Sequence, residues 1–237
     1  MKRNLARIFG ISENLNSFLY RFNIRIRKIH NTSEIHKVLD YFMTPILTGE
    51  SLKRVGPEGD GGYYLPASFD KIRGFVSPGV GDIIGFDRYL LDLGMKGVLC
   101  DGTIDAEIVE PHPNMVFLNK NIGLGKGQVT LEEIVNSQFN SIDDLILQMD
   151  IEGDEYLILS FTPPEIIRRF RIISLELHSL FRILDQWQLQ NLFIPMYKLF
   201  SENYDVVSCS TNEIGKHFYI GGRKQPNIIE VTLVRKN

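Results

Sequence analysis

The sequence has little cysteine, no long apolar run and no internal repeat or low-complexity tract, and each shortage excludes a class of protein. Its two cysteines, Cys100 and Cys209, both lie in apolar segments, which indicates buried thiols in a reducing compartment and argues against a disulfide framework. No apolar run reaches about 18 residues, so we expect no transmembrane segment and a cytoplasmic protein. The 237 residues, 43% of them hydrophobic, suffice for one large domain or for one domain with an appendage.

Charge is unevenly distributed along the chain. Residues 1–54 hold 10 Lys and Arg against 4 Asp and Glu, which leaves 16 against 25 for residues 55–237. Apolar residues at helical spacing around Leu15–Phe22 and Ile35–Tyr41 predict a helical arm over residues 1–50, before a main domain over residues 51–237. The basic arm is interpreted as a solvated face, or as a contact with an anionic substrate, a membrane surface or a second subunit in a homo-oligomer. A nucleic-acid partner is not expected, because the main body is acidic and lacks an aromatic-basic patch.

From residue 70 onward, strand and helix signals alternate, a pattern typical of a doubly wound α/β fold. The apolar runs predict parallel strands over Ile72–Ser77, Gly97–Cys100, Met115–Leu118, Leu145–Met149 and Arg171–Leu175. Helices are expected near Phe86–Leu93, Leu131–Asn136, Pro164–Phe170 and Trp187–Phe200. The last two strands, Tyr204–Ser208 and Ile228–Val234, have no convincing helix between them, so an antiparallel pair should close the sheet.

Ionisable residues follow two of the predicted buried strands. Asp150 and Glu152 come after Leu145–Met149, and Glu176 and His178 come at the end of the next strand. Ligands of open parallel sheets bind outside the carboxyl ends of the strands, so these four side chains are expected to converge on one cleft. Buried charges need a partner or a function, which makes this cleft the candidate active site.

A glycine turn and a carboxylate point to a nucleoside cofactor. Gly79 and Gly81 follow the first parallel strand, and Asp101 ends the second, where a carboxylate can accept both hydroxyls of an adenosine ribose. The third glycine, Gly85, is one residue too far along for the dinucleotide fingerprint Gly-x-Gly-x-x-Gly. This spacing disfavours a pyrophosphate and favours S-adenosylmethionine, which carries adenosine without phosphate.

Several motifs in this order resemble the FkbM-like class I S-adenosylmethionine-dependent methyltransferases, over residues from about 55 to the end. They are Asp60-Gly61-Gly62-Tyr63, Ser77-x-Gly79-Val80-Gly81-Asp82, Asp101, Met149-Asp150-Ile151-Glu152-Gly153-x-Glu155, Leu175-Glu176-x-His178 and Pro226-x3-Glu230-Val231-Thr232-x2-Arg235. The sequence departs from the family at Pro78 and in residues 208–212, where only Asn212 of a His/Asn-rich stretch is kept.

The resemblance implies a Rossmann-like class I methyltransferase fold, with a seven-stranded, mostly parallel sheet and an antiparallel last strand. It also implies methyl transfer to a sugar hydroxyl of a nucleotide-linked sugar or a polysaccharide, as in the synthesis of a capsule or glycan. The residues to which the resemblance assigns binding of the methyl acceptor are Glu152, His178 and Asn212. Those on the cofactor side are Asp60, Tyr63, Ser77, Gly79, Gly81, Asp101 and Asp150.

Two mechanisms stay open for the acidic cleft. In one, His178 is the general base, oriented by Glu176 or another carboxylate, with Asp150 and Glu152 as the other catalytic residues. In the other, Asp150, Glu152, Glu176 and His178 hold Mg²⁺ or Mn²⁺, which binds the acceptor hydroxyls. His178 could also be a core histidine.

Other residues have ordinary structural interpretations. Asp154 and Glu155 are expected to cap the following helix, and Asp60 with Tyr63 forms either a loop over the cofactor or a simple turn. Trp187, at helical spacing with its apolar neighbours, is expected to pack in the core. Two other functions remain open: an NAD(P)-dependent oxidoreductase, and a non-catalytic Rossmann-like interaction module that uses the basic arm.

Overall fold

The computed structural model describes residues 31–59, 61–105, 107, 109–141, 143–211 and 216–236. Contacts divide the chain between Thr32 and Ser33, and the second unit contains the sheet. The helix expected over Ile35–Tyr41 is α2 (Thr32–Met43), whose apolar face buries Ile35, Val38, Leu39 and Phe42. The helix expected over Leu15–Phe22, and most of the proposed arm, lie outside the described residues. The boundary at residue 50 stays a prediction.

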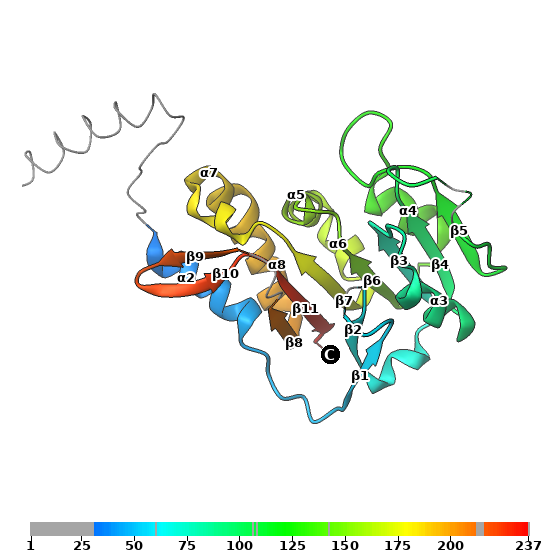
Figure 1. Ribbon diagram of the computed structural model, residues 1–237, viewed down its shortest axis with the longest axis horizontal. Helices are drawn as coiled ribbons and strands as arrows, with labels where there is room; N and C mark the ends of the chain where they lie inside the picture. The colour runs from blue at the N-terminus through cyan, green and yellow to red at the C-terminus, as the bar shows by residue number, and fades with distance from the viewer. Residues whose placement is uncertain are drawn as a thin grey trace, which may run out of the picture. The chain divides into compact units, whose positions relative to one another are not determined.

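Seven strands form one twisted sheet in the order β5-β4-β3-β6-β7-β11-β8 (Figure 1). Their bounds are β3 (Gly74–Pro78), β4 (Lys96–Cys100), β5 (Met115–Leu118), β6 (Leu145–Met149), β7 (Phe170–Leu177), β8 (Tyr204–Thr211) and β11 (Ile229–Arg235). The pairs among β3 to β7 are parallel, whereas β11 runs antiparallel to both β7 and β8. The predicted fold class, a Rossmann-like sheet with an antiparallel last strand, is therefore confirmed.

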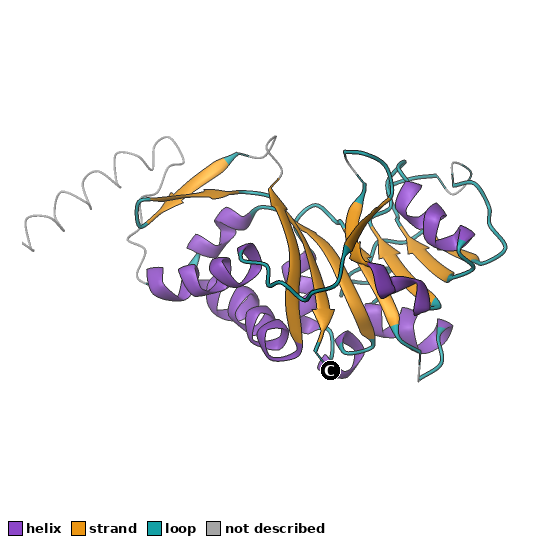
Figure 2. Cartoon of the chain, turned by 90° about the horizontal axis from the view of Figure 1, so that it is seen from below, coloured by secondary structure: helices purple, strands orange, loops and turns teal. Residues whose placement is uncertain are grey.

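Helices pack along the sheet (Figure 2). They are α3 (Gly85–Asp92), α4 (Leu131–Gln138), α5 (Glu155–Phe161), α6 (Pro164–Ile167), α7 (Gln186–Gln188) and α8 (Ile194–Asn203), with short helical turns η2 (Ala67–Lys71), η3 (Leu180–Leu184) and η4 (Leu189–Phe193). Helix α4 begins at a capping box, in which Thr130 and Glu133 satisfy each other's backbone amides. Parallel strands buried by helices need continuous apolar runs, which is why the sheet could be recognised from the sequence.

Two hairpins stand beside the main sheet and were not predicted. The first pairs β1 (Leu52–Val55) with β2 (Tyr63–Pro66), and the second pairs β9 (His217–Ile220) with β10 (Arg223–Pro226). The first hairpin contributes Val55, Tyr63 and Leu65 to a core cluster that also contains Phe86 of α3 and Phe75 of β3. Strand β2 and helix α3 are thereby held against the same part of the sheet.

Three local expectations were wrong. Helix α6 ends at Ile167, because Phe170 is already the first residue of β7. The single helix expected over Trp187–Phe200 is divided by a π-helical turn, η4, just before Pro195, whose nitrogen cannot donate a helical hydrogen bond. Trp187 does not pack in the core, since 61% of its surface is exposed.

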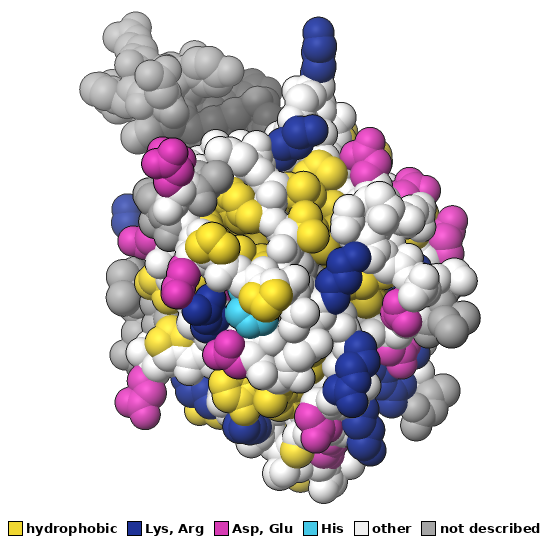
Figure 3. Space-filling model, turned by 90° about the vertical axis from the view of Figure 1, so that its right-hand side faces the viewer, with side chains coloured by type: hydrophobic (Ala, Val, Ile, Leu, Met, Phe, Trp, Pro, Cys, Tyr) yellow, Lys and Arg dark blue, Asp and Glu magenta, His cyan; other side chains and the backbone are white. Residues whose placement is uncertain are grey.

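Figure 3 shows Lys and Arg side chains interspersed with acidic and apolar ones on the face that carries β5. Cys100 is buried as expected, and Cys209 is half-buried. Among the described residues, no helix has the length and apolarity needed to cross a bilayer.

Candidate functional site

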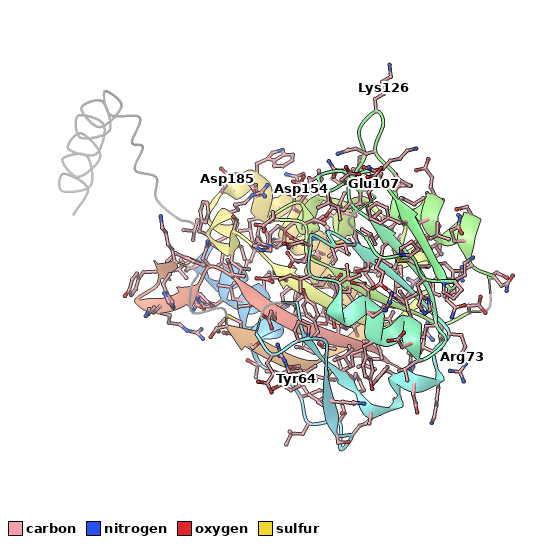
Figure 4. The ribbon with its side chains drawn as sticks, turned by 45° about the vertical axis from the view of Figure 1, so that its right-hand side comes forward. Tyr64, Arg73, Glu107, Lys126, Asp154 and Asp185 are labelled. Carbon is pink, nitrogen blue, oxygen red and sulfur yellow. The ribbon has the colours of Figure 1, made fainter. Side chains whose placement is uncertain are left out.

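A cavity of about 470 Å³ opens at the carboxyl ends of the parallel strands. Strand β3 lies between β4 and β6, so it marks the point where successive crossovers leave in opposite directions. Figure 4 shows Glu107, Lys126 and Asp154, from the loops after β4, β5 and β6, along this edge, with Arg73 at the opposite edge. The volume lies in the range of small-molecule sites.

The glycine turn after β3 forms one wall of the cavity. Gly79 has a φ of +80°, and a Cβ atom at this position would lie 1.6 Å from the carbonyl oxygen of Asp150. Its amide donates to the carbonyl of Cys100 at 3.0 Å, and the amide of Asp150 donates to the carbonyl of Pro78 at 3.3 Å. Only glycine therefore fits where the ends of β3, β4 and β6 meet.

Asp101 faces the same cavity from the end of β4. Its Oδ2 accepts a hydrogen bond from the amide of Gly81 at 3.0 Å, and its Oδ1 accepts from the amide and hydroxyl of Thr103. Burial opposes ionisation, but these hydrogen bonds outweigh it and lower the pKa of Asp101. The carboxylate is charged, fixed in orientation and able to accept further hydrogen bonds from hydroxyl groups.

Tyr63 and Ser77 belong to one buried hydrogen-bond chain. The Ser77 hydroxyl donates to Gln148 Oε1 at 2.6 Å, and Gln148 Nε2 donates to the Tyr63 hydroxyl at 3.1 Å. Tyr63 and Gln148 line the cavity, whereas Ser77 is fully buried behind them. Ser77 therefore supports the wall. Asp60 and Asn212, the other predicted binding residues, lie outside the described residues.

The structure brings the four predicted acidic-cleft residues together around one imidazole. Nε2 of His178 lies 3.7 Å from Asp150 Oδ1, 3.6 Å from Glu152 Oε2 and 3.7 Å from Glu176 Oε1. Asp150 and Glu152 line the cavity, while Glu176 and His178 are buried next to them. The residues at the end of β7 therefore lie behind the cavity-lining residues that follow β6.

Glu155 is a site residue that the sequence interpretation missed. Its side chain is fully buried, and Oε1 lies 3.0 Å from Nδ1 of His178. The same oxygen accepts hydrogen bonds from the amides of Ile151 and Gly153, both at 3.1 Å. Glu155 therefore fixes the loop after β6 and the orientation of His178 at once. The available signal was a further acid two residues after the Asp-Ile-Glu-Gly segment.

The cluster changes the acidity of its members. Burial disfavours the charged imidazole, but the hydrogen bond that Nδ1 donates to Glu155 and the charges of Glu155, Asp150 and Glu176 raise the pKa of His178 to about 9. Burial, together with the charge of Glu176, raises the pKa of Asp150 to about 8. Perturbed pKa values of this kind concentrate at functional sites.

Two non-glycine residues adopt left-handed backbone conformations at this site. Glu152, after β6, has a φ of 59°, and Ser179, after β7, has a φ of 52°. Such conformations cost free energy in L-residues and persist where the surrounding structure holds them in place. These left-handed residues lie in the loops after β6 and β7, next to His178, and they set the directions in which the two loops leave the sheet.

A subset of the cluster has the spacing of metal ligands. One ligand atom from each of Asp150, Glu176 and His178 lies within 4.8 Å of the others. Two carboxylates and one imidazole suit Mg²⁺ or Mn²⁺. The same oxygen atoms also suit hydrogen bonding to hydroxyl groups, so geometry alone leaves both roles available.

Comparisons with known proteins give weak likenesses to solved structures, one of them described as an rRNA methyltransferase. No protein-family model and no curated protein matches the chain. Fibrillarin in a complex with Nop5p aligns over 69% of this chain and 73% of its own, with 10% identity and a TM-score of 0.40. The Methanococcus jannaschii fibrillarin pre-rRNA processing protein aligns over 81% and 87%, with 11% identity and a TM-score of 0.39. A 16S rRNA adenine methyltransferase from Catenulisporales acidiphilia aligns over 78% and 98%, with 11% identity and a TM-score of 0.37.

Proposed function

We propose that the chain is an S-adenosylmethionine-dependent O-methyltransferase that acts on a hydroxyl of a sugar nucleotide or a polysaccharide. The observation that carries this proposal is the position of His178, held on one side by Glu155 and surrounded on the other by carboxylates that border the cavity of the glycine turn. The cavity proposed for the cofactor and the histidine proposed to activate the acceptor hydroxyl therefore lie next to each other. The proposal that the methyl acceptor is a sugar is supported by the sequence resemblance. It is also supported by the carboxylates at the site, which can accept hydrogen bonds from sugar hydroxyls.

The cavity fits the cofactor on chemical grounds. The glycine turn lets a ligand approach the backbone, and Asp101 presents a charged carboxylate on which ribose hydroxyls can bind. Asn121, Ile122 and Gln128 close the side of the cavity beyond Asp101, where an adenine ring can lie. When bound, S-adenosylmethionine supplies a methyl group activated by a positive sulfonium.

The residues of the chain would then position the acceptor and remove its proton. Asp150 and Glu152 accept hydrogen bonds from acceptor hydroxyls at the cavity border, which orients the attacking oxygen. In its neutral form, His178 takes the hydroxyl proton at Nε2 as the new bond forms. Glu155 stabilises the resulting imidazolium through Nδ1, and the surrounding carboxylates favour the same charge.

The first prediction concerns the identity of the cofactor. S-adenosylhomocysteine should bind the wild-type protein and NAD should not, and Asp101→Asn should weaken S-adenosylhomocysteine binding by about 10-fold or more, because hydrogen bonds to a charged group are lost. Titration calorimetry measures each affinity, with Asp105→Asn on the exposed part of the same loop as the control. Preference for NAD would favour an oxidoreductase, and binding of neither ligand would favour an interaction module.

A second prediction concerns the metal. We expect methyl transfer to continue in EDTA, because carboxylates that hydrogen-bond hydroxyl groups, backbone amides and a histidine need no ion. Formation of S-adenosylhomocysteine from sugar-nucleotide acceptors, with and without chelator, gives the readout. Loss of activity in EDTA that Mg²⁺ or Mn²⁺ restores would instead assign an ion to Asp150, Glu176 and His178.

A further inference from the structure

A buried carboxylate in the cavity wall has no part in the mechanism above. Asp87, on α3, is 3% exposed and lines the cavity together with Phe86 and Tyr63. The rings of Phe86 and Tyr63 pack edge to face, with their centroids 5.4 Å apart, and provide an apolar setting. Among the described residues, no hydrogen-bond partner reaches Oδ1 of Asp87. An acid in such a place costs stability unless a ligand completes its hydrogen bonds.

The electrostatic setting of Asp87 differs from that of Asp101. Burial raises the pKa of Asp87 to about 7, although the nearby Ser77 hydroxyl and the backbone amide of Asp87 oppose the rise. Asp101, in contrast, accepts three hydrogen bonds from the protein, and its pKa is lowered. Asp101 is thus already charged and satisfied by neutral donors, whereas Asp87 gains most from a cationic donor.

We propose that Asp87 is the partner of the α-ammonium group of S-adenosylmethionine, and that it selects ligands carrying an amino-acid moiety. This inference rests on the proposed function. The ammonium group is positively charged and donates hydrogen bonds, so it can give Oδ1 both a counter-charge and a hydrogen-bond donor. The sulfonium is positively charged but has no hydrogen to donate. Asp87 and Asp101 line the same cavity as the glycine turn, so the amino-acid and ribose parts of a single ligand would each meet a carboxylate.

The test compares two ligands that differ only in the ammonium group. S-adenosylhomocysteine and its desamino analogue, which keeps the carboxylate, are titrated into the wild-type protein and into Asp87→Asn. The wild-type protein should prefer S-adenosylhomocysteine by about 10-fold or more, and Asp87→Asn should lose this preference by weakening that ligand alone. Asp92→Asn, an exposed acid on the same helix, is the matched control and should keep the preference.

The outcomes separate the two levels of the proposal. If the wild-type protein binds S-adenosylhomocysteine and Asp87→Asn retains the full preference, the role of Asp87 is overturned while the proposed function stands. Equal loss of both ligands in Asp87→Asn would also overturn it, because Asp87 would then support the cavity generally. If the wild-type protein binds neither ligand, the proposed function fails and this inference fails with it.

Thermal unfolding shows whether Asp87→Asn is folded and gives an independent readout. The folded pKa of about 7 lies above the ordinary value of 3.8, so Asp87 favours the folded state at low pH and loses this contribution as pH rises through 7. Asp87→Asn should lack this decline and unfold at a higher temperature than the wild-type protein at pH 8. Lower stability of the variant at pH 8 would identify Asp87 as a structural partner and overturn the inference.

Discussion

With His178 replaced by alanine, methyl transfer is expected to fall by about 10²–10⁴-fold, the range that a positioned general base contributes. Glu155 fixes the imidazole through Nδ1, and Nε2 lies 3.6–3.7 Å from carboxylate oxygens of Asp150, Glu152 and Glu176. A water molecule in the place of the ring would be a weaker base in a less defined orientation, so the loss should appear in kcat. Cofactor affinity should be unchanged, because the cavity-lining residues do not include His178.

Single-turnover assays with saturating S-adenosylmethionine and a sugar-nucleotide acceptor measure the chemical step, and calorimetry with S-adenosylhomocysteine measures cofactor binding. The matched control is His217→Ala, an exposed histidine on β9, which should behave like the wild-type protein. Turnover near the wild-type rate in His178→Ala, with the cofactor product still bound, would show that His178 is a core histidine. The catalytic assignment would then be wrong.

The second large effect is expected from Glu155→Gln, with turnover lower by about 10–100-fold. Glutamine keeps a carbonyl oxygen for the amides of Ile151 and Gly153, so the loop can retain its shape. It removes the charge that favours imidazolium, so the pKa of His178 should fall and the rising limb of the pH–rate profile should move to lower pH. Because Oε2 is buried without a hydrogen-bond partner among the described residues, its replacement by an amide should also cost about 1–3 kcal/mol of stability.

The pH–rate profile distinguishes a positioning role from a merely structural one. A structural defect lowers the rate at every pH without moving the profile, whereas loss of the charge at Nδ1 moves it. Glu165→Gln, an exposed acid in the first turn of α6, serves as the control. A Glu155→Gln variant with the wild-type profile would mean that Glu155 acts only on the loop and that another group orients His178.

The parallel part of the sheet could be predicted because buried strands need uninterrupted apolar runs. The hairpins could not be recognised in that way. Strand β1 carries two basic residues and is largely exposed, and β9 alternates between exposed and buried positions outside the main sheet. The Gly221-Gly222 pair between β9 and β10 is a known hairpin signal, so the second hairpin was the more accessible of the two.

The site was predicted as far as side chains follow directly from strand ends. Asp150, Glu152, Glu176 and His178 converge because neighbouring parallel strands end at the same edge. Glu155 was missed because an acid in the first turn of a helix usually stabilises that helix, whereas here a loop with a left-handed residue, Glu152, leads into the helix and Glu155 binds His178. Asp87 was missed for a related reason. Its helix is buried partly by Tyr63 of the unpredicted first hairpin, so its burial depends on a distant part of the chain.

The contact between Gly79 and Asp150 ties the two halves of the proposed reaction to one point of the backbone. With 1.6 Å between the carbonyl oxygen of Asp150 and the place a Cβ would occupy, even alanine at position 79 must push the ends of β3 and β6 apart. The displaced segment carries Asp150 and Glu152 and leads directly to Glu155. A substitution in the glycine turn would therefore also misalign the residues that position the methyl acceptor. Affinity for cofactor and the geometry of transfer therefore cannot vary independently at this position.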